Sequence, residues 1–63
     1  MSSGAELSSI HTALEGLTQR ITGFADTLAG TERDDLAAAL YEVERSLSTA
    51  QRRLGKIVDA LIS

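Results

Sequence analysis

The stretch that decides the fold runs from Leu36 to Leu61 and reads LAAALYEVERSLSTAQRRLGKIVDAL. Its apolar residues recur at alternating steps of four and three, which is the spacing of a coiled-coil seam. They are Leu36, Leu40, Val43, Leu47, Ala50, Leu54, Ile57 and Leu61. The first half of the chain carries a matching series, namely Leu7, Ile10, Leu14, Leu17, Ile21, Phe24 and Leu28. The sequence therefore predicts two helices, each with an apolar ladder along one side.

The two ladders pair when the chain folds back on itself about residue 32. Leu28 then lies opposite Leu36, and Leu7 lies opposite Ile57. Each apolar residue of the first series between them also has an apolar residue of the second series opposite it. In antiparallel coiled coils the two apolar positions of the seven-residue repeat, a and d, lie opposite each other in this way. The register therefore predicts an all-α antiparallel coiled-coil hairpin, with these paired residues as its seam. Leu61 lies beyond the register and has no apolar partner in the hairpin.

The ends of the helices are marked by capping residues. Gly30 suits the left-handed conformation that ends a helix, and Thr31 with Asp34 has the spacing of a capping box that opens the next one. We expect the first helix over about residues 4–29, a turn of Gly30 and Thr31, and the second helix over about residues 32–62. So short a turn predicts antiparallel neighbours.

Length and composition narrow the class of protein. The chain has 63 residues, which we interpret as a single domain over residues 1–63, and it contains neither cysteine nor proline. No apolar run approaches the roughly 20 residues that span a bilayer, and Met1 to Gly4 does not resemble a signal peptide, so a cytoplasmic protein with no membrane contact is expected. The net charge of −3 makes nucleic acid an unlikely partner.

A chain this small seldom buries enough apolar surface to fold alone, so a partner is expected. Small residues flank the ladders, which is typical of helices in a four-helix bundle, and we predict a homodimer of that form. The predicted dimer or partner face comprises Ala37, Tyr41, Val58, Leu61 and Ile62. A strip along the first helix that includes Gly16 and Gly23 is the rival face.

Charge order along the second helix suggests how two copies meet. Residues 32–44 carry a net charge of −4 and residues 45–56 a net charge of +4. Two copies of this helix running antiparallel would set each acidic half beside a basic half. The alternative is that the charges complement the dipole of their own helix.

The sequence gives little support for catalysis. His11 is the only histidine, and we expect it to hydrogen-bond across the hairpin to Gln51. A metal site needs several converging ligands, and no serine has a histidine and carboxylate relay. We therefore predict a protein that is not an enzyme and has no cofactor and no metal.

Arg45, Arg52 and Lys56 line the outer side of the second helix and form a possible anion face. The length, the two-helix plan and the turn near Gly30 resemble the Rop family of plasmid RNA-binding regulators, which implies a dimeric antiparallel four-helix bundle. That family binds RNA through basic and polar residues of its first helix, and in the first helix of this chain Arg20 is the single arginine or lysine.

Glu44, Ser48 and Asp59 fall on the pattern E-x3-S-x2-R-x3-Q-x3-D and resemble the anti-sigma hairpins that bind cyclic di-GMP. Gln51 stands in place of the arginine and Gly55 in place of the glutamine. The first helix carries no second copy of the pattern.

These observations favour a small non-catalytic module for dimerisation or protein–protein interaction, such as a regulatory adaptor that binds another helical protein. One alternative is a regulator that binds RNA or a nucleotide through the anion face. Another is a small subunit that folds only on a larger protein partner.

Overall fold

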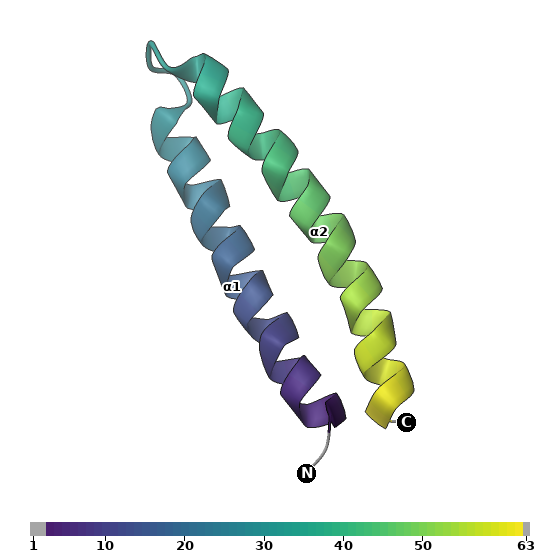
Figure 1. Ribbon diagram of the computed structural model, residues 1–63. Coiled ribbons are helices and arrows are strands. Elements are labelled where there is room, and N and C mark those ends of the chain that lie inside the picture. Colours follow the sequence, from purple (N-terminus) through teal and green to yellow (C-terminus); the bar gives the residue numbers. More distant parts are fainter. Residues whose placement is uncertain (1–2, 63) are drawn as a thin grey trace.

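The computed structural model describes residues 3–62 and contains two helices, α1 (Ser3–Leu28) and α2 (Asp34–Ile62). The helices lie side by side and run antiparallel, with the turn at one end and both termini at the other (Figure 1). The molecule is a single layer that measures 49 × 16 × 10 Å. The predicted all-α helical hairpin is confirmed. None of the helical segments within residues 3–62 has the length and apolarity required to cross a membrane.

The turn is longer than predicted. Gly30 has a φ of 79°, the left-handed conformation expected of it. The Thr31 hydroxyl donates to the carbonyl of Leu28 at 2.6 Å and accepts from the N–H of Arg33 at 3.1 Å, while the Asp34 carboxylate accepts from the N–H of Gly30. Thr31 thus closes the turn instead of capping α2, and the second helix begins at Asp34, two residues later than expected.

The contact between the helices is made by small and polar side chains. The most buried residues are Ala25, Ala37 and Val58, together with Thr18 and Gly4. Thr18 donates its hydroxyl to the carbonyl of Leu14 at 2.8 Å, so its polar atom is satisfied inside its own helix. Because most of these residues are small, each buries little apolar area and the core of the hairpin is small.

The predicted register is supported by His11. Its Nε2 atom donates to the main-chain oxygen of Gln51 at 3.0 Å, which confirms the expected hydrogen bond across the hairpin. Its ring also lies beside Gly55, where a Cβ atom would stand 3.4 Å from Nε2. Gln51 and Gly55 lie on either side of residue 53, the position opposite His11 when the chain folds about residue 32.

Candidate protein interface

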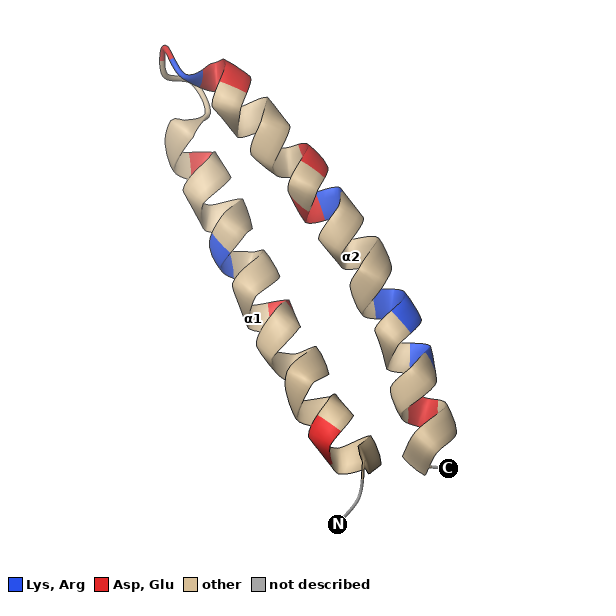
Figure 2. Cartoon of the chain, in the orientation of Figure 1, with Lys and Arg blue, Asp and Glu red and all other residues tan. Residues whose placement is uncertain are grey.

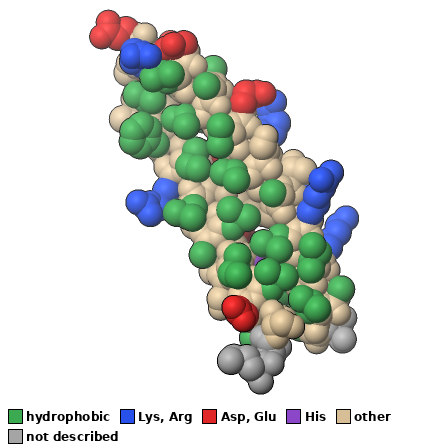
Figure 3. All heavy atoms as spheres, viewed as in Figure 1, with side chains coloured by type: hydrophobic (Ala, Val, Ile, Leu, Met, Phe, Trp, Pro, Cys, Tyr) green, Lys and Arg blue, Asp and Glu red, His purple; other side chains and the backbone are tan. Residues whose placement is uncertain are grey.

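The facing helix covers the apolar ladders only in part. Leu17, Phe24 and Val43 remain 50%, 65% and 45% exposed, and Ile10, Leu36 and Ile57 are exposed to similar extents. Ala50 is also exposed, whereas the remaining predicted seam residues are half-buried: Leu7, Leu14, Ile21, Leu28, Leu40, Leu47 and Leu54. Apolar side chains of both helices form one continuous band on one side of the hairpin (Figure 3). We call the two ladders together the apolar face.

The most buried residues are neighbours of the ladder residues and not the ladder residues themselves. Four of the five most buried residues directly follow an exposed ladder residue: Thr18 follows Leu17, Ala25 follows Phe24, Ala37 follows Leu36, and Val58 follows Ile57. One residue turns an α-helix by about 100°, so the buried stripe and the ladder occupy neighbouring sides of the same helix. The helices bury the stripe of smaller residues against each other and leave the larger residues on the apolar face.

Two of the five residues of the dimer face predicted from the sequence lie inside the hairpin. Ala37 and Val58 are 3% and 6% exposed because they lie inside the hairpin, so neither presents a surface to a second molecule. Tyr41 is half-buried and donates its hydroxyl to Asp26 at 2.5 Å. Leu61 and Ile62 are exposed at the open end, where Leu61 continues the apolar ladder and Ile62 lies against Gly4.

Two shallow hollows indent the apolar face. One is lined by Leu17, Ile21, Phe24 and Leu40, with Arg20 at its side. The other surrounds Ala50 and is lined by Leu14, Ser46, Thr49, Arg53, Leu54 and Ile57. Both hollows are lined largely by apolar side chains from both helices, so their chemistry suits apolar side chains of another helix.

The rival strip on α1 presents a different surface. Gly16 and Gly23 are both exposed, and a Cβ atom added at either would meet no atom within 4 Å. This part of α1 offers open backbone without the large apolar side chains that the apolar face carries.

Along α2, acidic residues gather toward the turn and basic residues follow them, while one acidic residue, Asp59, lies near the open end (Figure 2). Within the predicted anion face, Arg45 pairs with Glu42 at 2.7 Å. Arg52 lies 3.5 Å from the hydroxyl of Thr49 and, with Lys56, lines a hollow beside His11. One of the three cations thus has a carboxylate beside it, in a pair whose side chains are both largely exposed.

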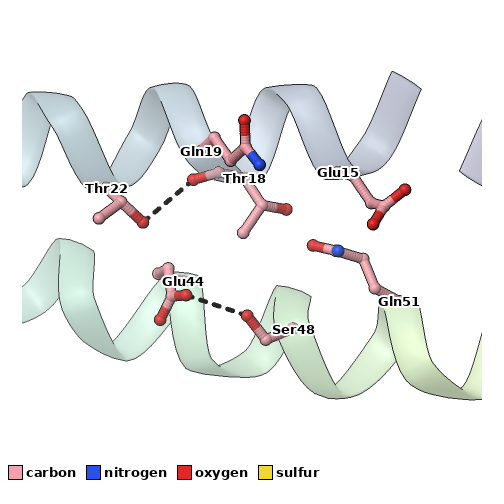
Figure 4. Close-up of a pocket in the computed structure, with 7 residues that line it drawn as sticks. All are labelled: Glu15, Thr18, Gln19, Thr22, Glu44, Ser48 and Gln51. Carbon is pink, nitrogen blue, oxygen red and sulfur yellow. Dashed lines mark hydrogen bonds between the residues drawn. The ribbon is translucent and has the colours of Figure 1, made fainter. Parts of the chain in front are cut away.

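A narrow polar crevice runs along the junction between the helices. Figure 4 shows Thr18 and Thr22 of α1 facing Glu44, Ser48 and Gln51 of α2. Thr22 donates to the carbonyl of Thr18 at 3.2 Å, and Ser48 donates to the Glu44 carboxylate at 3.0 Å. The side-chain oxygen of Gln51 is buried and accepts no hydrogen bond within residues 3–62.

Three positions of the cyclic di-GMP pattern, the matching Glu44 and Ser48 and the substituted Gln51, meet in this crevice, while Gly55 and Asp59 lie in the neighbouring hollow beside His11. The positively charged groups of that hollow, Arg52 and Lys56, come from positions outside the pattern. No cluster of three or more His, Cys, Asp or Glu residues that could hold a metal ion occurs in the described part of the chain.

Sequence reasoning found the residues of the apolar face but missed the stripe that pairs the helices. The available signal was the recurrence of smaller residues every seventh position, at Gly4, Thr18 and Ala25 with His11 between them. No family model matches the chain, and neither the curated proteins nor the solved structures include a significant match to it.

Proposed function

We propose that this protein is a non-catalytic helical interaction module that functions as a homodimer, with the apolar faces of two hairpins packed together as a four-helix bundle. The observation that carries the proposal is the exposure of both ladders on one side of the hairpin, including Leu17 at 50% and Phe24 at 65%. Contiguous exposed apolar surface of this kind marks a site of protein association.

The exposed area supports a partner of similar size. The chain exposes 4592 Å², whereas a compact monomer of 6.7 kDa exposes about 3,900 Å². A compact particle of twice that mass would expose about 6,500 Å², against about 9,200 Å² for two separate hairpins. The difference of about 2,700 Å² lies in the range of permanent dimers, which bury about 2,000–5,000 Å².

The small core of the hairpin also favours association. Its buried apolar residues are Ala25, Ala37 and Val58, which is little for a chain that must offset the entropy of ordering about 60 residues. Covering the apolar face would add the burial that the isolated hairpin lacks. Dimerisation and folding would then be coupled.

The alternatives have less support. Binding of RNA or a nucleotide by Arg45, Arg52 and Lys56 is disfavoured by the net charge of −3. A larger helical partner could cover the same apolar face, and the experiment below separates that case from the homodimer.

Sedimentation equilibrium over a wide concentration range, with helicity followed in parallel, tests the proposal. We expect a helical dimer whose mass falls to that of a monomer in the variant Val43→Asp, because that change puts a charge on the apolar face. Ala38→Asp is the matched control, since Ala38 is exposed on α2 but outside both ladders. A wild-type monomer at all concentrations would overturn the homodimer, and poor helicity in that monomer would favour a larger partner.

A further inference from the structure

One edge of the apolar face carries a stripe of polar residues along α2. Glu42, Ser46, Thr49 and Arg53 follow one another at steps of four, three and four residues, so they lie in one line along the helix. Ser46, Thr49 and Arg53 line the hollow around Ala50, which places the stripe directly beside the apolar face.

The order of side chains along the stripe is complementary to that of a second copy running in the opposite direction. A second copy running antiparallel places Glu42 opposite Arg53 and Ser46 opposite Thr49. The centre of this symmetry lies between Leu47 and Ser48, close to the middle of α2, so two helices related by a twofold axis at that point end nearly flush. The central pair consists of short side chains, which permits close approach of the two backbones.

The charges at the ends of the stripe cannot satisfy each other within one hairpin. Glu42 and Arg53 are eleven residues apart, which is about 16 Å along a helix. Arg53 forms no ion pair within residues 3–62, and Glu42 is held by Arg45 in a pair whose side chains are both largely exposed. Arg53 therefore has its charge available beside a surface that requires cover.

The wider distribution of charge favours the same orientation. Residues 32–44, at the turn end, carry a net charge of −4 and residues 45–56 a net charge of +4, with the acidic Asp59 beyond them (Figure 2). A dimer with both turns at one end would bring two acidic regions together, whereas a dimer with turns at opposite ends sets each acidic region beside a basic one.

We propose that the two hairpins pack with their turns at opposite ends and α2 against α2 of the second copy, and that Arg53 of each copy pairs with Glu42 of the other. This arrangement rests on the proposed homodimer and adds its orientation and its two intermolecular ion pairs. The partner of the apolar face is thus a second copy of this chain, held in register by charge.

Charge exchange tests the ion pairs. Arg53→Glu and Glu42→Arg should each weaken dimerisation about tenfold, because each places like charges together at two symmetric positions. The double variant Glu42→Arg with Arg53→Glu should return to within about threefold of wild type. Arg52→Glu makes the same change of charge on the outer side of α2 and should leave the dimer unaffected. Failure of the double variant to recover would overturn the pairing.

A distance measurement tests the orientation separately. The chain has no cysteine, so Glu32→Cys provides a unique attachment point for a spin label in the exposed turn. Turns at opposite ends predict a separation between the two labels comparable to the 49 Å length of the hairpin. Turns at the same end would bring the labels within about 20 Å, or two helix diameters, which would overturn the orientation but leave the dimer intact. A monomeric wild-type protein in sedimentation would instead overturn the proposed function itself.

Discussion

Truncation of Leu17 to alanine gives a quantitative test of the apolar face. Leu17 lies near the middle of α1 and of the hairpin, and half of its side chain is exposed. Alanine is a better helix former than leucine, so a loss of intrinsic helicity cannot explain a weakened dimer. The substitution therefore isolates the contribution of apolar burial.

The magnitude follows from the exposed fraction. Full burial of a leucine side chain contributes about 1.5–3 kcal/mol, so covering the exposed half contributes about 1 kcal/mol per copy. A dimer contains two copies, which gives about 2 kcal/mol and a rise in the dissociation constant of about 30-fold. Any cavity left in the closed bundle would add to this figure.

The assay is sedimentation equilibrium with interference optics, because the chain has no tryptophan and a single tyrosine. Ile62→Ala is the matched control, since Ile62 is 60% exposed but lies against Gly4, outside both ladders. Its dissociation constant should stay within about twofold of wild type, where twofold corresponds to roughly 0.4 kcal/mol. A Leu17→Ala variant that dimerises like wild type, beside an Ile62→Ala variant that does not, would refute the reasoning and move the interface to the open end.

Three further predictions concern stability. The melting temperature of the wild-type chain should rise with protein concentration, because association stabilises the folded state by mass action, and a constant melting temperature would contradict coupled folding and dimerisation. Gly16→Ala should stabilise the helix by about 1 kcal/mol, because a Cβ atom there meets no other atom. Gly30→Ala should destabilise the hairpin by about 1 kcal/mol, because Gly30 has a φ of 79°. Thermal melts measure both changes. The Asp26 carboxylate accepts a hydrogen bond from the hydroxyl of Tyr41 and raises the pKa of Tyr41 above its ordinary value of 10.0. The folded state therefore holds the hydroxyl proton more tightly than the unfolded state does. The resulting stability should be present below pH 10 and lost as the pH rises through the raised pKa, and urea titrations should find this loss absent in Tyr41→Phe.

Local sequence signals were sufficient for the outline of the hairpin. Helix identity follows from apolar periodicity, and the turn follows from Gly30, whose left-handed conformation few other residues adopt. The register also followed, since the contact of His11 with Gln51 was expected from the pairing of the two ladders. The start of α2 was missed because the hydroxyl of Thr31 can bond within the turn as well as cap a helix, and sequence alone does not distinguish the two.

The sequence by itself determined that two helices form, where they turn, and which side of each is apolar. Only the tertiary structure decided which side of each helix faces the other. An apolar ladder specifies a surface that needs cover, but it does not specify whether the cover comes from the same chain or from another. In the hairpin, smaller residues such as Ala25 and Ala37 meet each other, and the larger rungs such as Leu17 and Phe24 remain exposed. The physical reason is that each helix has two neighbouring sides suitable for packing, and a two-helix chain can bury only one of them against itself.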